Sequence, residues 1–484
     1  MSPRRWLLAD QLGPHFVDDD QPVLLVEAKA LFRQRPLHRQ KAHLILSAIR
    51  HRAAELGERA LLLRTETFRQ ALSQVTGAIE VCHPPSRAAL RFARSVEGLS
   101  ILPPRGFMTS FDEFAQWADG NRRGPLRMAA FYRDARRRHD VLLGTLDAPP
   151  PSANRPAPPP SDRRIPPVPE IEEDDIDAEV RRDLDRWTAE GIRFIGRDGP
   201  RRYPATHAEA DARLQHFLRH RLAGYTRQVP MSTQDHVLAH SQLSSSFNLG
   251  LLDPAPAVRA AEAAGRTGNV PPAAVASFVR QLLGWREFLW QLYWYFDPAY
   301  RSPNWLIANE PIPDWFLNLE ADALQAHCMS DALGAVRDRA WAHHAQRLLL
   351  LGNYGLQRGW RPAELADWFQ RAFVDGADWV MNATVIGMSQ YADLARIDTR
   401  PYAVSGVQID DGSDYCGNCC YDPVRDLGEG ACPYTAGIAA FYQRNRARLG
   451  GDARLLEHVT SDVTDKDRLD AIAAQEAKRA STAP

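Results

Sequence analysis

The sequence predicts two domains of different class: an α/β domain with a parallel sheet over residues 1–147 and an all-α domain over residues 176–460. Three observations support this prediction. Short apolar runs between turn residues fill the first part, a proline-rich stretch follows at 148–175, and beyond it apolar residues recur at three- and four-residue steps. Strand, helix and strand in succession are typical of an α/β fold.

The α/β prediction depends on three apolar runs. Residues 5–10 and 22–27 each end in an acidic residue, and 60–64 is a third such run after Gly57. Such runs are typical of buried parallel strands. Residues 40–56 have helical spacing. In sheets of this kind a ligand usually binds at the carboxyl ends of the strands, where Asp10, Gln11 and Glu27 would lie.

The proline-rich stretch cannot sustain a helix or a central strand, so residues 148–175 are predicted to be an extended interdomain linker. Beyond it the apolar spacing predicts helices at 206–222, 273–296, 331–358, 362–373 and 434–448. The last residues, 461–484, are rich in Ala, Asp and Lys and are predicted to form a solvated tail.

Composition limits the class of protein. A chain of 484 residues with 44% hydrophobic content can bury a large core, and it has no run of about eighteen apolar residues that would predict a membrane span. The first ten residues turn acidic too early for a signal peptide, so we expect a cytoplasmic protein. The formal net charge of −1 gives no overall attraction to nucleic acid, so any DNA-binding surface must be local.

Four of the six cysteines have the arrangement of metal ligands. Cys416, Cys419 and Cys432 follow one another with two and twelve residues between them, and Cys328 lies sixteen residues before His344. Four thiolates can hold one zinc ion or one iron-sulfur cluster, and spacing alone does not choose between them. Metal-bound thiolates fit a reducing compartment better than a disulfide framework does.

Several strings in the helical half resemble photolyases and cryptochromes. The string Phe-Val-Arg-Gln-Leu-Leu-Gly-Trp-Arg-Glu-Phe at 278–288 resembles the Trp-Arg-Glu-Phe helix of that superfamily. The segments 240–252 (His-Ser-Gln-Leu-Ser-Ser-Ser-Phe-Asn-Leu-Gly-Leu-Leu) and 375–381 (Asp-Gly-Ala-Asp-Trp-Val-Met) are similar to it as well. This resemblance implies a photolyase/cryptochrome architecture for the whole chain.

Other strings resemble one branch only, the iron-sulfur bacterial cryptochromes and photolyases. They are Trp-Ala-His-His-Ala-Gln-Arg-Leu at 341–348, Ile-Gly-Met-Ser-Gln-Tyr-Ala at 386–392, Ala-Asp-Gln-Leu at 9–12, Ser-Ala-Ile-Arg-His at 47–51, and the four cysteines. In that branch the matching cysteines hold a 4Fe-4S cluster, whereas Cys82 and Cys420 match none of the ligands. A four-cysteine zinc site is the alternative.

The resemblance also implies a flavin site and an antenna. The residues assigned to FAD are Ser241, Ser244, Gln281, Trp285, Arg286, Trp368, Asp375 and Asn382. Of these, Trp368 matches the flavin-proximal end of an electron-transfer chain. In this branch the first domain holds the antenna 6,7-dimethyl-8-ribityllumazine, and Asp10, Gln11 and Glu27 match the positions expected to contact it.

The activity that the resemblance implies is light-driven repair of (6-4) photoproducts in DNA. His344 is the implied proton donor with His343 supporting it, and Tyr402 lines the lesion pocket. A histidine suits the role because its ordinary pKa of about 6.5 lets it donate and recover a proton near neutral pH. The expected partner is ultraviolet-damaged DNA with a flipped-out lesion, bound by a monomer.

Two other functions compete with repair. A cryptochrome-like blue-light photoreceptor would bind the same cofactors and signal through a protein partner; it is favoured by Glu320, which stands where the branch usually has a tryptophan, and by Asn-Ala-Thr at 382–384, where the branch tends to read Val-Pro-Asn. The third candidate is a DNA-binding iron-sulfur protein without photochemistry, because the cluster region also resembles the large subunit of primases. Retention of His343, His344 and Tyr402 favours repair.

Overall fold

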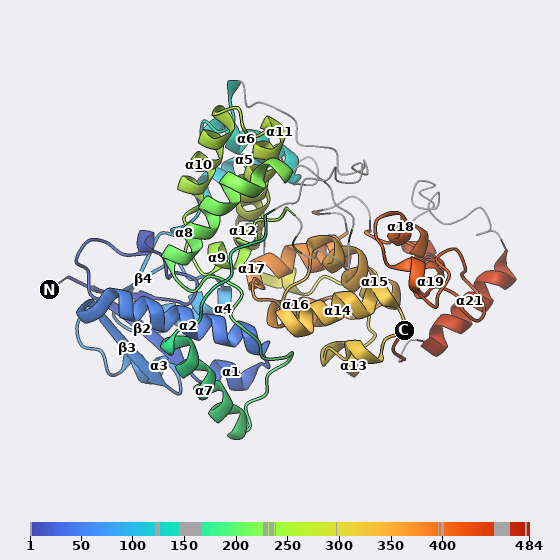
Figure 1. Cartoon of the computed structure of the whole chain (residues 1–484), viewed down its shortest axis with the longest axis horizontal. Coiled ribbons are helices and arrows are strands. Elements are labelled where there is room, and N and C mark those ends of the chain that lie inside the picture. Colours follow the sequence, from blue (N-terminus) through green and yellow to red (C-terminus); the bar gives the residue numbers. More distant parts are fainter. Residues whose placement is uncertain are drawn as a thin grey trace.

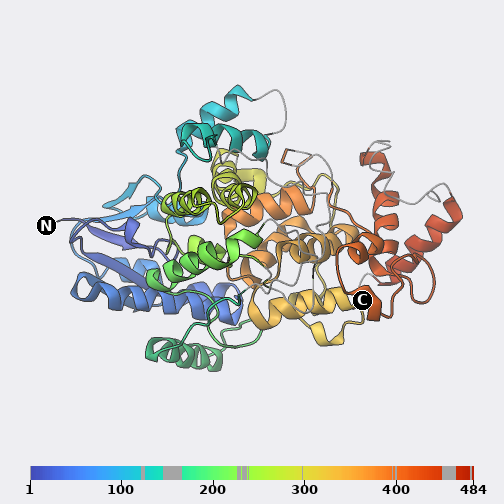
Figure 2. The same ribbon diagram turned by 45° about the horizontal axis from the view of Figure 1, so that its top comes forward.

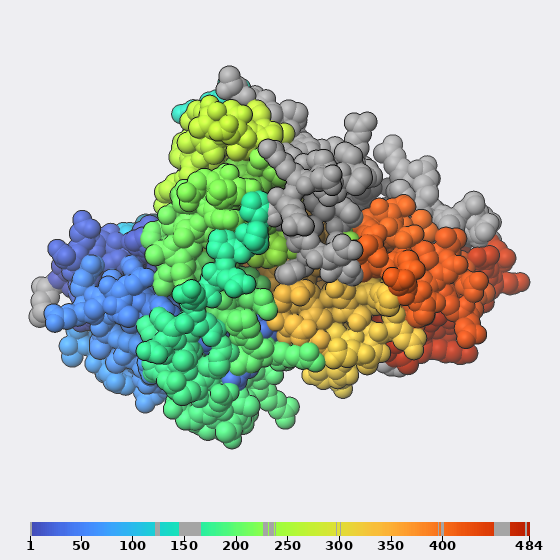
Figure 3. Space-filling view, viewed as in Figure 1, coloured from blue at the N-terminus to red at the C-terminus, as the bar shows by residue number. Residues whose placement is uncertain are grey.

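The computed structural model describes residues 2–121, 126–144, 166–225, 231, 237, 239–296, 298–394, 396–397, 401–449, 465–479 and 482–484. Figure 1 shows a sheet domain at one end, a large helical domain beside it and the last helices at the opposite end. In the space-filling view of Figure 3, the green atoms of the middle of the chain lie between the blue first domain and the orange helices.

The first domain is built on one parallel five-stranded sheet with the order β3-β2-β1-β4-β5. Its strands are β1 (Arg4–Leu7), β2 (Val23–Ala28), β3 (Ala60–Thr65), β4 (Ile79–Cys82) and β5 (Leu99–Leu102). The central strand β1 pairs with β2 and β4, so that Trp6 lies beside Leu24 and Val81. The predicted parallel sheet is confirmed, with β4 and β5 as strands that the apolar runs did not reveal.

Helices cover both faces of this sheet, which explains why most residues of β2 and the end of β1 are apolar on both sides of the sheet. On one face, the long helix α2 (Arg39–Leu56) packs Leu44 and Ile49 against Leu25. On the other face, Trp6 and Leu24 pack with α3 (Phe68–Leu72) and α4 (Arg87–Arg94). The short helix α1 (Ala30–Gln34) follows β2 directly.

Two helices of the first domain belong to the core of the second. The helices α5 (Phe111–Gly120) and α6 (Met128–Arg138) pack against the helical domain, where Phe131 lies between Phe114 and Phe288 at ring-centroid distances of 5.4 and 5.7 Å. Figure 1 shows α5 and α6 grouped with α10 (Pro254–Arg266) and α11 (Pro272–Val279). The two domains therefore share one continuous core.

The predicted linker and domain boundary need a correction. Residues 148–165 lie outside the described residues, and 166–174 carry no helix or strand. The next helix, α7 (Asp175–Ala189), packs on the first domain, because Val180, Leu184 and Trp187 form an apolar cluster with Phe32 and Leu46 of α1 and α2. Residues 176–189 are thus part of the sheet domain's packing, where the prediction assigned them to the helical domain.

The rest of the described chain is helical, as predicted. Its remaining helices are α8 (His207–His216), α9 (Ser244–Asn248), α12 (Glu287–Tyr295), α13 (Asp314–Leu317), α14 (His327–Arg339), α15 (Asn353–Arg358), α16 (Pro362–Ala372), α17 (Asp378–Met381), α18 (Gly406–Asp411) and α19 (Pro433–Leu449). No helix within the described ranges is long and apolar enough to cross a membrane.

Wider π-helical turns interrupt these helices at four places: Phe217–Arg221, Arg280–Arg286, Gln346–Gly352 and Asn382–Ser389. Turns of this kind are rare and are often found at functional sites. Three of the four fall within or beside the strings that carry the family resemblance.

The helix predicted over 331–358 is in fact broken. Helix α14 ends at Arg339, Ala340 takes a left-handed φ of 50°, and the chain resumes helical form at His344, just before the π-helical turn Gln346–Gly352. A tertiary hydrogen bond from the Val374 N–H to the Ala340 carbonyl, 2.9 Å long, holds the break. His343 lies in this break, and His344 is the first residue of the helical segment that follows it.

The predicted solvated tail contains a packed helix. Helix α21 (Lys466–Arg479) lies alongside α19, with Ile472 buried against Ala436 and Ala439. Glu476 of α21 forms a buried ion pair with Arg358 of α15. Figures 1 and 2 both show these helices side by side at the far end of the molecule. Burial of Ile472 and Glu476 excludes a freely solvated segment here.

The buried ion pair between Glu27 and Arg50 gives Glu27 a structural role, which a substitution can test. Its carboxylate accepts two hydrogen bonds from Arg50, 2.7 and 2.8 Å long, and both side chains are 3% exposed. We expect Glu27→Gln to lower the free energy of unfolding, towards the lower end of the roughly 3–5 kcal/mol that follows loss of one partner from a buried pair, because Asp183 still contacts Arg50. Urea unfolding measures this. Glu58→Gln is the exposed control, and an equal effect of both substitutions would contradict the assigned role.

Candidate functional sites

The four predicted ligand cysteines converge on one pocket of about 310 Å³. Cys328 lies in the first turn of α14, Cys416 and Cys419 flank a short turn, and Cys432 precedes α19. All four are unpaired thiols, and the pocket between them has mainly apolar walls that include Ile409, Tyr415 and Tyr434. Cys420 is exposed and Cys82 is buried in the sheet, so neither faces this pocket.

The separation of the sulfurs bears on the kind of group that fits. Among the described residues, no three of these cysteine sulfurs lie within 4.8 Å of one another. A zinc ion with Zn–S bonds of about 2.3 Å holds its sulfurs roughly 3.8 Å apart. The four thiols therefore do not stand at the spacing that the ligands of a single zinc ion would have.

Electrostatics also favours a cationic occupant. Burial raises the pKa of the Cys328 thiol well above its ordinary value, with Cys432, Cys419 and Cys416 adding to the effect. Burial likewise raises the pKa of Cys416 to about 12. Thiols in such surroundings ionise when a metal supplies the compensating positive charge.

A second site is formed by three histidines from two parts of the chain. His343 lies between the other two, with its ring centroid 4.3 Å from that of His240 and 4.2 Å from that of His344. The Nε2 atoms of His240 and His343 are 2.5 Å apart. His240 was not assigned from the sequence, although it begins the string at 240–252 that resembles the flavin turn.

His343 and His344 differ in accessibility. His343 is buried, whereas His344 is exposed. Desolvation nevertheless lowers the pKa of His344 to about 4, with Arg347 adding to the effect. His344 is thus exposed to solvent but closely surrounded by protein atoms, so it lies in a concave part of the surface. We call this part of the surface the histidine recess.

A polar cluster adjoins this recess. The Asp375 carboxylate accepts a 2.7 Å hydrogen bond from the Ser244 hydroxyl and bonds of 2.8 and 3.1 Å from Arg347. Burial acts to raise the pKa of Asp375, but Arg347 and Ser244 outweigh it and the net pKa is lowered. Two of the predicted flavin residues, Ser244 and Asp375, are thus in direct contact.

The other predicted flavin residues are more scattered. The Ser241 hydroxyl accepts a 3.4 Å bond from the Leu243 N–H, Gln281 is exposed, Trp285 is half-buried and Asn382 is buried. Trp368 is fully buried with its ring 4.4 Å from Phe316. Tyr402 is half-buried and follows Pro401, the first described residue after 398–400.

Behind the histidines, Gln346 connects the recess to the cysteine pocket. Its side-chain oxygen accepts the His343 backbone N–H at 2.9 Å, and its amide donates to Asp331 and to the hydroxyl of Tyr415 at 2.9 and 2.8 Å. Tyr415 lines the cysteine pocket and immediately precedes Cys416. One buried hydrogen-bond network therefore touches both sites.

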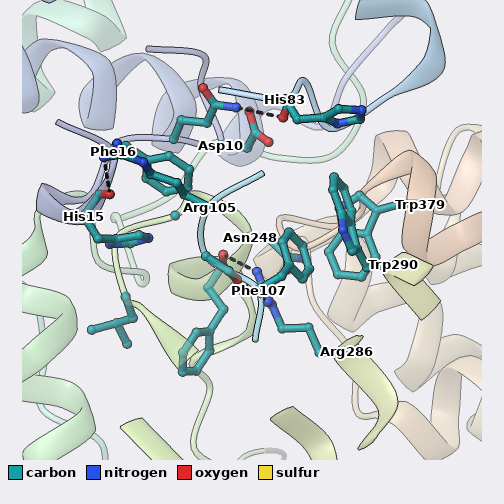
Figure 4. Close-up of a pocket in the computed structure, with 15 residues that line it drawn as sticks. Asp10, His15, Phe16, His83, Arg105, Phe107, Asn248, Arg286, Trp290 and Trp379 are labelled. Atoms are coloured by element: carbon teal, nitrogen blue, oxygen red, sulfur yellow. Dashed lines mark hydrogen bonds between the residues drawn. The ribbon is translucent and has the colours of Figure 1, made fainter. Parts of the chain in front are cut away.

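The third site is a pocket of about 400 Å³ between the two domains. Asp10 and Gln11 reach it from the carboxyl end of β1, as predicted, and His83 reaches it from the end of β4. Figure 4 shows these groups on one side, with Phe107, Arg286 and two tryptophans, Trp290 and Trp379, around the rest. Glu27 is absent from this lining because it is held in its ion pair with Arg50.

Arg286, predicted to contact FAD, lies in this interdomain pocket. Its guanidinium donates a 2.7 Å bond to the Gly106 carbonyl and lies 4.1 Å from the Phe107 ring centroid. Phe107 in turn stacks on Trp290 with centroids 4.1 Å apart. The motif identified the residue but not the direction in which its side chain points.

The pocket is polar at one end and aromatic at the other. Burial raises the pKa of Asp10 to about 7, opposed by Arg286, and burial lowers the pKa of His83 to about 4. Weakly charged donors and acceptors beside stacked aromatic rings suit a flat ligand with polar edges. Of these residues, Asp10 and Gln11 were expected, whereas His15, His83, Arg105 and Phe107 lie in no string that the sequence singled out.

Comparison with solved structures defines the class of protein. A bacterial class III photolyase from Agrobacterium tumefaciens has a TM-score of 0.55 with this chain at 16% identity, covering 99% of this chain and 98% of that one. A cryptochrome from Synechocystis sp. PCC6803 has a TM-score of 0.52 at 13% identity, covering 99% and 93%. The sheet domain and the helical domain of this chain thus have the photolyase/cryptochrome fold.

Sequence comparison then shows the family. The family model described as deoxyribodipyrimidine photo-lyase-related protein matches residues 5–193. A (6-4) photolyase of Agrobacterium fabrum is 33% identical over 493 residues, an alignment that covers 94% of each chain. This chain belongs to the photolyase-related family, as its sequence strings indicated.

Two glycines test how closely the domains meet at the interdomain pocket. A Cβ at Gly250 would lie 2.4 Å from the Asp10 carbonyl oxygen, and its φ is +67°. Gly268 has a φ of +80° with nothing within 4 Å of such a Cβ. We expect Gly268→Ala to lose about 1–2 kcal/mol of unfolding free energy from backbone strain, and Gly250→Ala to lose clearly more in urea unfolding. Equal losses would contradict a tight domain contact.

Proposed function

We propose that this protein is a light-driven (6-4) DNA photolyase that uses FAD, a 4Fe-4S cluster and a lumazine antenna. The observation that carries the proposal is the accessible His344 in a recess beside the Ser244–Arg347–Asp375 cluster. It is supported by the relative named (6-4) photolyase. The expected substrate is damaged DNA whose lesion is flipped out of the duplex.

The cysteine pocket would hold the cluster. Cys328, Cys416, Cys419 and Cys432 supply four thiolates, and the wide separation of their sulfurs supports a cluster over a single zinc ion. An apolar shell with Tyr415 and Tyr434 limits the access of water to such a group.

The helical domain would hold FAD, which in its reduced, light-excited state supplies the electron for repair. The guanidinium of Arg347 has N–H groups beyond those that donate to Asp375, and these are donors of the kind that a diphosphate needs, whereas the Ser244 hydroxyl donates its hydrogen to Asp375. Asp375 fixes both of these groups in place. Trp368, buried against Phe316, is the residue proposed to lie nearest the flavin in the electron-transfer chain.

The proton would come from His344. A (6-4) lesion requires a proton transfer during repair, and His344 is accessible while His343 is buried and held by hydrogen bonds. In the free protein the pKa of His344, about 4, keeps the imidazole neutral at pH 7. A lesion that brings anionic phosphates into the recess raises this pKa and lets the imidazole take up the proton that it then donates.

The interdomain pocket would hold the lumazine. Asp10 and Gln11 can bond to the polar edge of its ring, and the Phe107–Trp290 stack provides an aromatic wall. The Gln11 amide already donates to the carbonyls of Cys82 and His83, so its oxygen is the group left for a ligand. Glu27 does not belong to this site, because its carboxylate is paired with Arg50.

The alternative is a cryptochrome-like photoreceptor with the same cofactors, and one observation favours it. Glu320, at the place of the usual outer tryptophan, is exposed and cannot relay an electron. Trp315 offers a different route, because its ring lies 5.6 Å from that of Phe316, next to Trp368. Trp341 packs in a separate cluster beside Arg347.

A repair assay separates the two functions. Flavin-loaded protein under blue light should repair an oligonucleotide with a single (6-4) photoproduct and leave a cyclobutane dimer unchanged. We expect His344→Ala to reduce (6-4) repair by roughly 10²–10⁴-fold, the range for loss of a general acid, with the flavin absorption retained. His220→Ala, at an exposed histidine, is the control. Repair of neither lesion by the unmodified protein would favour the photoreceptor.

Iron analysis tests the cluster. Cys328→Ser should remove most of the bound iron and acid-labile sulfide, because it deletes one of four ligands. Cys420→Ser, which changes a neighbouring thiol that does not face the pocket, should retain both. Stoichiometric zinc without iron in the unmodified protein would overturn the cluster assignment.

A further inference from the structure

We propose that His240 is a positioning residue for the proton donor: it accepts a hydrogen bond from His343 and so fixes the ring against which His344 packs. This proposal rests on the proposed repair function and adds a third histidine to it. His240 lies about a hundred positions before His343 and His344 in the sequence, but its ring contacts that of His343.

The tautomer of His343 follows from its two neighbours. Its Nδ1 accepts the Ala345 backbone N–H at 3.2 Å. A ring nitrogen that accepts a hydrogen bond carries no hydrogen, so in neutral His343 the hydrogen is on Nε2. That Nε2 faces the Nε2 of His240 at 2.5 Å. His240 must therefore present a lone pair at Nε2 and carry its own hydrogen on Nδ1.

This arrangement argues against a metal site. One ring nitrogen from each of His240, His343 and His344 lies within 4.8 Å of the others, a spacing that could suit a metal ion. A metal needs a lone pair from each ligand. His343 has none to give, since its Nδ1 is engaged by the backbone and its Nε2 holds the hydrogen donated to His240.

The same arrangement separates the roles of the two adjacent histidines. Both nitrogens of His343 are engaged, and its ring lies 4.2 Å from that of His344, tilted by 48°. Among the described residues, no hydrogen bond involves the imidazole of His344, which is also the exposed ring of the three. His344 is thus the imidazole that can exchange a proton with a ligand in the recess.

Removal of the acceptor at position 240 has a defined consequence. The His343 Nε2–H would be left buried without a partner, so the ring would gain by turning or by changing tautomer. Either change moves the surface that supports His344 and frees a second imidazole to compete for the proton. The charged groups that act on these rings are Arg347, next to His343 and His344, and Arg221, next to His240.

Two substitutions of similar size show whether His240 acts by accepting the hydrogen bond from His343 or only by filling the volume beside it. His240→Gln keeps an acceptor oxygen near the position of Nε2, whereas His240→Leu keeps volume without an acceptor. Long-range ¹H–¹⁵N spectra of full-length, cofactor-loaded protein labelled at histidine nitrogens report the tautomer of His343. We expect a single tautomer with hydrogen on Nε2 in the unmodified protein and in His240→Gln, and loss of that signature in His240→Leu.

Repair kinetics provide the second measurement. At saturating (6-4) oligonucleotide, His240→Leu should slow repair by about tenfold or more with little change in DNA affinity, because misplacement of a catalytic group by about 1 Å can reduce a rate a hundredfold. His240→Gln should restore most of the rate. A His240→Leu variant that repairs at the unmodified rate while His344→Ala is inactive would overturn the proposal.

The spectra and the repair kinetics test the proposal independently of each other. If the unmodified protein repairs no lesion, the proposed function fails, while the spectra still test the hydrogen bond from His343 to His240. If His240→Leu does not fold, as judged by circular dichroism and flavin absorption, the spectrum of the unmodified protein decides. A hydrogen found on Nδ1 of His343 would then overturn the proposal.

Discussion

The shape of the interdomain pocket depends on the hydrogen bonds that Arg286 and Glu287 form with the loop after β5. Glu287 is fully buried, and its carboxylate accepts the backbone N–H groups of Met108 and Thr109 at 3.0 and 2.9 Å. Arg286 donates to Gly106 of the same loop. A buried carboxylate is strongly destabilising unless its oxygens are paired, and Glu287 keeps its partners only while the two domains stay together. These hydrogen bonds therefore favour the joined arrangement of the domains. They thereby fix the shape of the pocket between them.

Burial without a built-in counter-charge is common to the candidate sites. Desolvation raises the pKa of the thiols in the cysteine pocket and lowers the pKa of the histidines in the recess, so that both sets favour the neutral state in the free protein. Under the proposed function, each set would change its charge on binding a ligand of the opposite sign. By contrast Asp375 is already compensated by Arg347, which suits a group that holds others in place.

The sequence predicted the parts of the fold whose signal is local. Strands β1 to β3 and helix α2 were found because their apolar residues stand in clear runs or at helical spacing, whereas Glu80 interrupts the apolar residues of β4 and Ser100 those of β5. The break after α14 could not be predicted, because it depends on the bond from Val374 to Ala340, two residues far apart in the chain. The cysteines were identified by their spacing. The place of Arg286 in the interdomain pocket could not be predicted, because a motif gives identity and not side-chain direction, and His240 was passed over because one histidine in a polar turn carries little signal.

The hydrogen bonds of Gln346 have a consequence for the maturation of the protein. This side chain ties the backbone of His343 to Asp331 and to Tyr415, the residue before the ligand Cys416. Tyr415 belongs to the wall of the cysteine pocket, so a group bound there as proposed would hold Tyr415 and, through Gln346, the backbone of His343. Under that proposal the filling of the cysteine pocket and the final shape of the histidine recess would be linked steps in the assembly of the protein.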